Sequence, residues 1–454
     1  MLYQIQADTN VIDASSVQDW INCFQSSIQP IRKKLGSYYD GYNAIVKQHV
    51  SQNRPNYSVN INLAKYITDV ATGYVFGEDI KYTADTENAT KVLEKINYIN
   101  QATKASDIDF NIGGDMSCYG IGYQMIMVEQ GDESLEDRIV LTRLNPERTF
   151  FVTDNTILQK PMCAVYYYSY FENKQKKVRV YVYDKENQYT FTGPLSSLIL
   201  EDVEPHFMGD IPIIQCLNND DAFGDYQQVC DILDALSLTM SNTTDDIQSI
   251  ANAFLAIYGA LLNGENKDEI NEERVMNVPV GGKVEWVVKN LNPDASNSHI
   301  DNLLKFLFQI SQVPDLTDDN FGGTQTGVAM RFKLWGLDQL WATKVKKYRA
   351  ALYKRLKILL YLLQYRFETS VQLEKEIKIS FFKNLPEDMS EQYEMVKALK
   401  GTVSEKTLLT NITVVDDVDA EIEQIKQERE EEADMYAFNN NKELNEETEK
   451  DKAL

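Results

Sequence analysis

Three aspartates in one short polar segment are the chain's nearest approach to a chemical site. Asp315, Asp318 and Asp319 lie in the sequence VPDLTDDNFGGTQTG, which occupies residues 313–327. Carboxylates at this spacing can bind a divalent cation, and a bound cation can assist phosphodiester hydrolysis. The segment lacks the central glycine and the final glutamate of an EF-hand calcium loop. Cation binding therefore stays an open interpretation of these acids.

Residues typical of other catalytic sites occur without the partners that catalysis needs. The only three histidines are far apart in sequence, at His49, His206 and His299. Cys118 has no nearby histidine, so a buried thiol at a helix-to-strand turn is the alternative to a nucleophile. The nearest approach to a GxxxxGKS/T phosphate loop, GGKV at residues 281–284, lacks the upstream glycine and the hydroxyl residue. We predict no catalytic residue, no metal and no cofactor.

The acidic segment leads directly into the longest helical pattern in the chain. An uninterrupted helix over residues 328–366 would span roughly 58 Å at 1.5 Å per residue. Its apolar stripe comprises Leu334, Trp341, Val345, Tyr348, Leu352, Leu356, Leu359 and Leu363. Between Arg331 and Arg366 there are 10 bases and one acid, a local net charge of +9. These bases suit three roles, namely gripping phosphates, facing solvent or pairing with acids of a neighbouring chain.

The remaining patterns predict a mixed α/β protein. Helical spacing of apolar residues predicts helices at about residues 15–29, 61–73, 88–99 and 103–119. Strand-like runs fill residues 123–217, and the polar residues 172–176 predict a hairpin turn. Two further helices are predicted at residues 225–260 and 298–312, with a compact insertion between them.

Length and charge limit the classes of protein to which the chain can belong. A chain of 454 residues is long enough for two to four structural units. The net charge of −24 disfavours adhesion of the bulk surface to nucleic acid, because phosphates are repelled. We expect no signal peptide and no membrane span, since the longest apolar run, residues 358–363, is too short to cross a bilayer. The five scattered cysteines suit a reducing compartment.

Four stretches resemble, in order, the portal proteins of tailed bacteriophages, in the subfamily typical of siphoviruses of Gram-positive hosts. The first is YYDG at residues 38–41, with NINLAKYITDVATGYVFG at 60–77 and IKY at 80–82. The second is YGIGY at residues 119–123, which turns into a strand. The third is GDIPII at 209–214, then Asn218, Asn219 and GDYQQVCDILDA at 224–235, and the fourth is GVAMRFKLWGL at 327–337.

This resemblance implies the fold of a portal ring subunit, with an α/β wing, a two-helix stem, a small clip, a long wing helix and a helical crown. The implied divisions are wing 1–224, first stem helix 225–260, clip 261–297, second stem helix 298–312, channel loop 313–327, long helix and wing remainder 328–389, crown 390–438 and acidic disordered tail 439–454. The chain departs from longer relatives in its short clip and its abbreviated acidic C-terminus.

The resemblance also implies a function and a set of partners. Twelve subunits would form a ring at one capsid vertex, through which double-stranded DNA is packaged and later ejected. The implied partners are the terminase large subunit, a head-tail adaptor, and the major capsid and scaffolding proteins, with no membrane. The protein would belong to the virion and assemble in the host cytoplasm.

The implied site is the channel loop. Its candidate residues are Asp315, Thr317, Asp318, Asp319, Asn320, Gly322 and Gly323. Repeated around a ring, the carboxylates would repel phosphates and let DNA slide, while the glycines relax the backbone limits. Two alternatives remain from the residues alone: a metal-dependent nucleic-acid-processing enzyme that uses the same acids, and another structural capsid or adaptor protein.

Overall fold

The computed structural model describes residues 4–7, 11–42, 56–84, 86–251, 254–258, 275–278, 285–287, 293–317, 331–363, 376–384, 397–404, 408–409 and 421–429. The chain divides into two compact units, residues 1–384 and residues 385–454. Within the described ranges, no helix combines the length and the apolar character that crossing a membrane requires.

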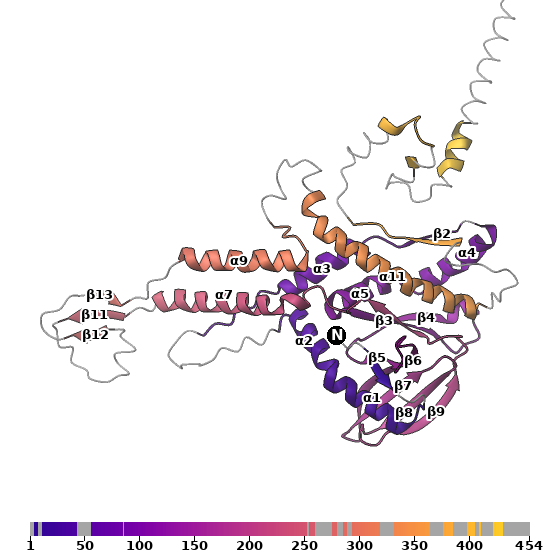
Figure 1. Cartoon of the computed structure of the whole chain (residues 1–454), viewed down its shortest axis with the longest axis horizontal. Coiled ribbons are helices and arrows are strands. Elements are labelled where there is room, and N and C mark those ends of the chain that lie inside the picture. Colours follow the sequence, from indigo (N-terminus) through magenta and orange to yellow (C-terminus); the bar gives the residue numbers. More distant parts are fainter. Residues whose placement is uncertain are drawn as a thin grey trace, which may run out of the picture. The chain divides into compact units, whose positions relative to one another are not determined.

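The first unit mixes helices and strands, as predicted (Figure 1). Its helices are α1 (Ala14–Ser27), α2 (Gln29–Tyr39), α3 (Leu63–Phe76), α4 (Glu87–Ala102), α5 (Ala105–Tyr119), α6 (Leu135–Arg138), the 3-10 helix η1 (Gln227–Val229), α7 (Cys230–Ala251), α9 (Pro293–Ser311) and α11 (Trp335–Leu362). Its strands are β1 (Ile5–Ala7), β2 (Lys81–Ala84), β3 (Ile121–Val128), β4 (Ile139–Leu144), β5 (Thr149–Asp154), β6 (Pro161–Glu172), β7 (Gln175–Tyr183), β8 (Asn187–Gly193), β9 (Ile199–Pro205), β10 (Ile213–Leu217), β11 (Phe254–Tyr258), β12 (Val275–Val278), β13 (Glu285–Val287) and β14 (Ile377–Ser380).

A six-stranded sheet with the order β1-β5-β6-β7-β8-β9 is covered on one face by α1. The side chain of Asp13 caps α1 by accepting a hydrogen bond from the Ser16 N–H at 2.8 Å. The predicted apolar face of this helix is buried against the sheet, where Phe24 stacks on Phe150 with ring centroids 4.6 Å apart. The sequence did not predict α2, which begins directly after α1 with a proline in its first turn.

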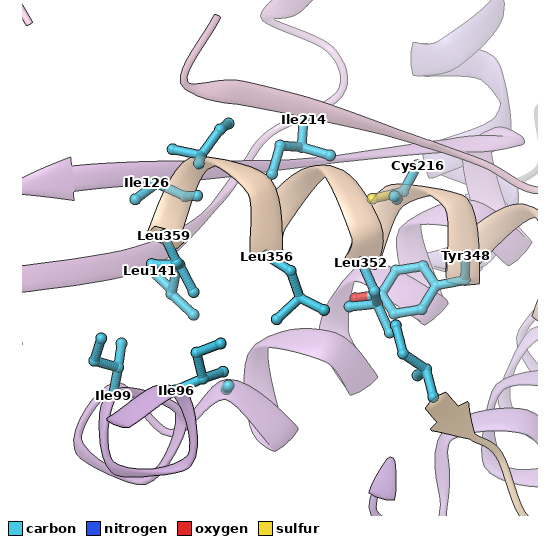
Figure 2. Close-up of a cluster of buried hydrophobic side chains, with 14 of the residues drawn as sticks. Ile96, Ile99, Ile126, Leu141, Ile214, Cys216, Tyr348, Leu352, Leu356 and Leu359 are labelled. Carbon is cyan, nitrogen blue, oxygen red and sulfur yellow. The ribbon is translucent and has the colours of Figure 1, made fainter. Parts of the chain in front are cut away.

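A three-stranded sheet, β10-β3-β4, lies between the six-stranded sheet and a helical layer. The two faces of β3 pack differently because successive side chains point to opposite sides. Tyr123 and Met125 pack with residues of the larger sheet, whereas Ile126 packs with α4, α5 and α11. Figure 2 shows Ile96 and Ile99 of α4 together with Leu352, Leu356 and Leu359 of α11 in this core.

Helices α7 and α9 pack against each other, and a small sheet with the order β12-β11-β13 lies between them in the sequence. The prediction of one continuous helix over residues 225–260 was wrong at both ends. Residues 227–229 form η1, and α7 ends at Ala251, before the strand β11. A short run rich in aromatic and branched residues fits helical and strand spacing equally well. Here the run forms a strand because β11 pairs with β12 and β13. Helix α9 also starts earlier than predicted, at Pro293.

The long helix is shorter than predicted. Residues 331–333 are helical, Leu334 is in a turn, and α11 then runs for 28 residues to Leu362, about 42 Å. The uninterrupted helix over residues 328–366 was therefore wrong. Gly336, in the first turn of α11, weakens the helix there and allows a close approach to Gln312. The predicted stripe is confirmed, since Val345, Tyr348 and the leucines from 352 to 359 are buried.

The second unit is described only in short stretches, with residues 421–429 helical and a β-bridge between Lys400 and Val403. Most of the predicted crown, the whole tail from residue 439, and most of residues 261–292 lie outside the described residues.

Candidate functional site

The start of the acidic segment is fixed by one tyrosine of α3. The Tyr66 hydroxyl donates a hydrogen bond to the Pro314 carbonyl at 2.9 Å and accepts one from the Leu316 N–H at 2.8 Å. Its ring packs edge-on against Phe308 of α9, with centroids 6.1 Å apart. Burial raises the pKa of Tyr66 further above neutral pH, and the protonated hydroxyl can donate. Tyr66 therefore joins α3, α9 and the segment.

Local side-chain bonds set the direction of the chain as it leaves this anchor. The Asp315 carboxylate accepts hydrogen bonds from the Thr317 N–H at 2.9 Å and from the Thr317 hydroxyl at 2.6 Å. This Asx turn bends the backbone without help from distant residues. Val313 is fully buried, whereas Leu316 keeps 45% of its surface exposed. The chain thus passes from the core to the surface within four residues.

The residue before the acidic segment and the start of α11 after it approach each other. A Cβ atom placed on Gly336, near the start of α11, would lie 3.0 Å from the carbonyl oxygen of Gln312, just after α9. Gln312 itself has a φ of 60°, which turns the chain sharply out of α9. The chain between these residues therefore leaves from and returns to nearly the same point.

Of the predicted loop residues, the structure describes only Asp315 and Thr317 and places them together in the Asx turn. The others, Asp318, Asp319, Asn320, Gly322 and Gly323, lie outside the described residues. Among the residues that are described, no group of three His, Cys, Asp or Glu side chains is arranged to hold a metal.

The helix after the segment is fastened by a buried ion pair that the sequence did not predict. The Lys344 ammonium contacts the Asp225 carboxylate at 2.7 Å, and both side chains are 1% exposed. Lys344 also donates to the Ser117 hydroxyl at 2.7 Å, and the Asn218 amide donates to Asp225 at 2.8 Å. Burial lowers the pKa of Lys344, and Asp225 opposes this effect. The cluster joins α11 to α5 and to the start of η1.

A second buried pair fastens the middle of α11. The Arg355 guanidinium binds both carboxylate oxygens of Asp109 at 2.8 Å, which is the bidentate geometry of a strong ion pair. The Tyr348 hydroxyl donates to the same carboxylate at 2.6 Å, and Arg355 also donates to the Tyr82 hydroxyl at 3.0 Å. Burial opposes the charge of Arg355, but Asp109, Tyr82 and Tyr348 together outweigh it and raise the pKa of the guanidinium.

Several bases of α11 are therefore neutralised within their own chain. Besides the two buried pairs, Lys347 pairs with Asp220, and Lys357 pairs with Asp210 at 3.1 Å. The interpretations of these bases as a solvated face, as partners for a neighbouring chain or as a phosphate grip were wrong for the buried Lys344 and Arg355, whereas the side chains of Lys347 and Lys357 are 28% and 65% exposed. Their acids lie far away in the sequence, so charge counting along the helix could not find them.

The other candidate groups have ordinary structural surroundings. Burial raises the pKa of the Cys118 thiol to about 12, so it is protonated and not a nucleophile. One ring nitrogen of His206 is 3.0 Å from the Asp184 carbonyl and the other accepts from the Met208 N–H at 3.2 Å, which stabilises a turn. His49 lies outside the described residues.

Comparison with known proteins gives a family match across most of the chain. Residues 21–435 match the family described as "Phage portal protein, SPP1 Gp6-like". The portal protein of Bacillus phage SPP1 is 25% identical over 438 residues, covering 89% of this chain and 82% of that protein.

Two solved structures of gene transfer agent particles are also similar. A chain of the virion of a native particle matches 83% of this chain and 91% of its own length, at 13% identity and a TM-score of 0.40. A chain of the neck of an empty particle matches 86% and 92%, at 12% identity and a TM-score of 0.42.

Proposed function

The chain belongs to the SPP1 Gp6-like family of phage portal proteins, and from this membership we propose that it forms a ring at one capsid vertex. Portal proteins of this family are structural components of the virion and not enzymes. The metal-dependent enzyme and the unrelated adaptor are therefore set aside. The family match over residues 21–435, which includes the acidic segment and both of its flanking helices, carries the proposal.

Within such a ring, residues 313–327 are the loop that faces the DNA channel. The support is the geometry at its base, where Tyr66 holds Pro314 and Leu316, and where Gln312 and Gly336, on either side of the segment in the sequence, lie close together. With twelve copies, Asp315, Asp318 and Asp319 would supply roughly three dozen carboxylates around the bore. This field repels phosphates at short range and leaves the duplex no strong binding minimum, so that DNA slides.

Helix α11 is the scaffold of the loop, because buried ion pairs hold it to α5 and η1. Helices α7 and α9 are the stem, and the small sheet between them in the sequence is part of the clip. The terminase large subunit and the head-tail adaptor dock on these parts. The ring is assembled in the host cytoplasm with the major capsid and scaffolding proteins.

Imaging of the purified protein tests the ring. Negative-stain microscopy and mass photometry should show closed rings of about twelve copies. A protein that stays monomeric at every salt and protein concentration would contradict the proposal.

Charge reversal tests the loop. Replacing Asp315, Asp318 and Asp319 by Lys should leave ring assembly intact and slow or stall DNA packaging, because the bore would then bind phosphates. The matched control reverses three exposed acids between β3 and α6, namely Glu129, Asp132 and Glu133, and should leave packaging by assembled rings unchanged. Unchanged packaging by the assembled loop variant would show that the loop does not line the channel.

A further inference from the structure

The outer edge of the six-stranded sheet is acidic and apolar at once. Among the strands that the structure describes, β9 pairs with β8 alone, and every residue of β9 is exposed. Its apolar residues Ile199, Leu200 and Val203 expose 66%, 44% and 44% of their surfaces. Among the residues that the structure describes, Asp202 and Glu204 have no ion-pair partner, whereas Glu201 pairs with Arg179 at 2.9 Å. An edge strand also offers unpaired backbone groups to a neighbour.

The hairpin of β6 and β7 projects beyond its neighbour in the same sheet. The last residue of β8, Gly193, pairs with Val178, whereas β6 and β7 continue pairing to Glu172 and Gln175. This extension is three residues long on β7, about 10 Å at strand spacing. Asn173 and Lys174 form the turn with positive φ values of 49° and 65°. The strands β6, β7, β8 and β9 lie side by side in Figure 1.

The tip of this hairpin has the opposite charge from β9. Lys174 and Lys176 are exposed and have no ion-pair partner in the described part of the chain. Phe171, on the adjacent part of β6, keeps 76% of its surface exposed. A large exposed ring beside two free ammonium groups suits a partner that presents both apolar side chains and carboxylates. Strand β9 presents both.

We infer that the basic tip of the β6–β7 hairpin, comprising Phe171, Lys174 and Lys176, docks on the β9 edge of a second copy of this chain. Within one copy β8 lies between β7 and β9, and Arg179 is the one base of β7 with a described ion pair to β9. A basic patch and an acidic patch at different places on one subunit make a head-to-tail contact, and rotation about one axis closes such contacts into a ring. The inference rests on the proposed ring and specifies one of its subunit contacts.

Charge-swap variants test the contact in the full-length protein. Lys174→Glu with Lys176→Glu, and separately Asp202→Lys with Glu204→Lys, should each raise the protein concentration for half-maximal ring assembly about tenfold at low salt. The four substitutions together should restore assembly to within about threefold of the parent, because the charges are then complementary again. The control Lys33→Glu with Lys185→Glu changes the net charge by the same amount as the hairpin variant. It reverses two exposed lysines elsewhere and should leave assembly unchanged.

Mass photometry across a range of protein and salt concentrations gives the readout. Unshifted assembly in both double variants, or no restoration in the fourfold variant, would overturn the inference. So would intact rings whose hairpin variants lose another capsid component, because the occupant would then be a different protein. A parent protein without rings would instead refute the proposed function, so the two failures are distinguishable.

Discussion

Removing the Tyr66 hydroxyl should loosen the base of the acidic loop without unfolding the protein. Tyr66→Phe keeps the ring that packs against Phe308 and deletes the two hydrogen bonds to Pro314 and Leu316, at 2.9 and 2.8 Å. Each such bond contributes about 1 kcal/mol net. Because Leu316 is 45% exposed, water replaces part of the loss, so local opening should become about 1–2 kcal/mol easier.

Hydrogen exchange of the Leu316 amide measures this change. A loss of 1–2 kcal/mol corresponds to exchange that is about five- to thirtyfold faster, if opening is fast compared with intrinsic exchange. Amides in the middle of α11 should keep their protection. The matched control is Tyr42→Phe, since the exposed Tyr42 hydroxyl has no hydrogen-bond partner among the described residues. An unchanged Leu316 rate in Tyr66→Phe would refute the anchor.

Three further changes test the packing of α11 and of α5. Lys344→Met should destabilise the protein by about 3–5 kcal/mol in denaturant unfolding, because Asp225 would stay buried without its partner. The control Lys346→Met, on the exposed face of α11, should cost less than about 0.5 kcal/mol. Gly336→Ala should cost about 1–3 kcal/mol by the same measurement, since the added carbon would lie 3.0 Å from the carbonyl oxygen at the end of α9. Burial raises the pKa of Asp115 from 3.8 to about 6 and Arg143 opposes the rise, so the folded state binds the extra proton between these values. The free energy of unfolding should therefore fall by up to about 3 kcal/mol as the pH rises from about 4 to about 6. Asp115→Asn should lack this decline.

The sequence predicted the layers of the first unit well because local spacing reports burial. The stripe of α1 and the stripe of α11 both have helical spacing, and both are buried as expected. The hairpin at residues 172–176 was likewise predicted from its polar turn, and the register of β6 and β7 confirms it. In each case the residues that decide the structure are neighbours in the sequence.

Features that depend on distant residues could not be predicted in this way. The apolar run Phe254–Tyr258 fits a helix until its pairing with β12 and β13 is known. Lys344 reads as a solvated base until Asp225, more than a hundred residues earlier, is placed beside it. Tyr66 has no chemical signature of its own, and its role depends on a contact with a segment about 250 residues away. One signal was available, because Tyr66 lies within the family motif at residues 60–77.

A reconstruction of the assembled protein by electron cryomicroscopy tests the central claim most directly. A gold label on an Asp315→Cys variant, with the exposed Cys23 replaced by Ser, marks the loop in each subunit. We predict a closed ring with the label lining the central bore at every subunit. A ring with the label on its outer surface, or a protein that forms no ring, would contradict the claim that this loop faces DNA in a portal channel.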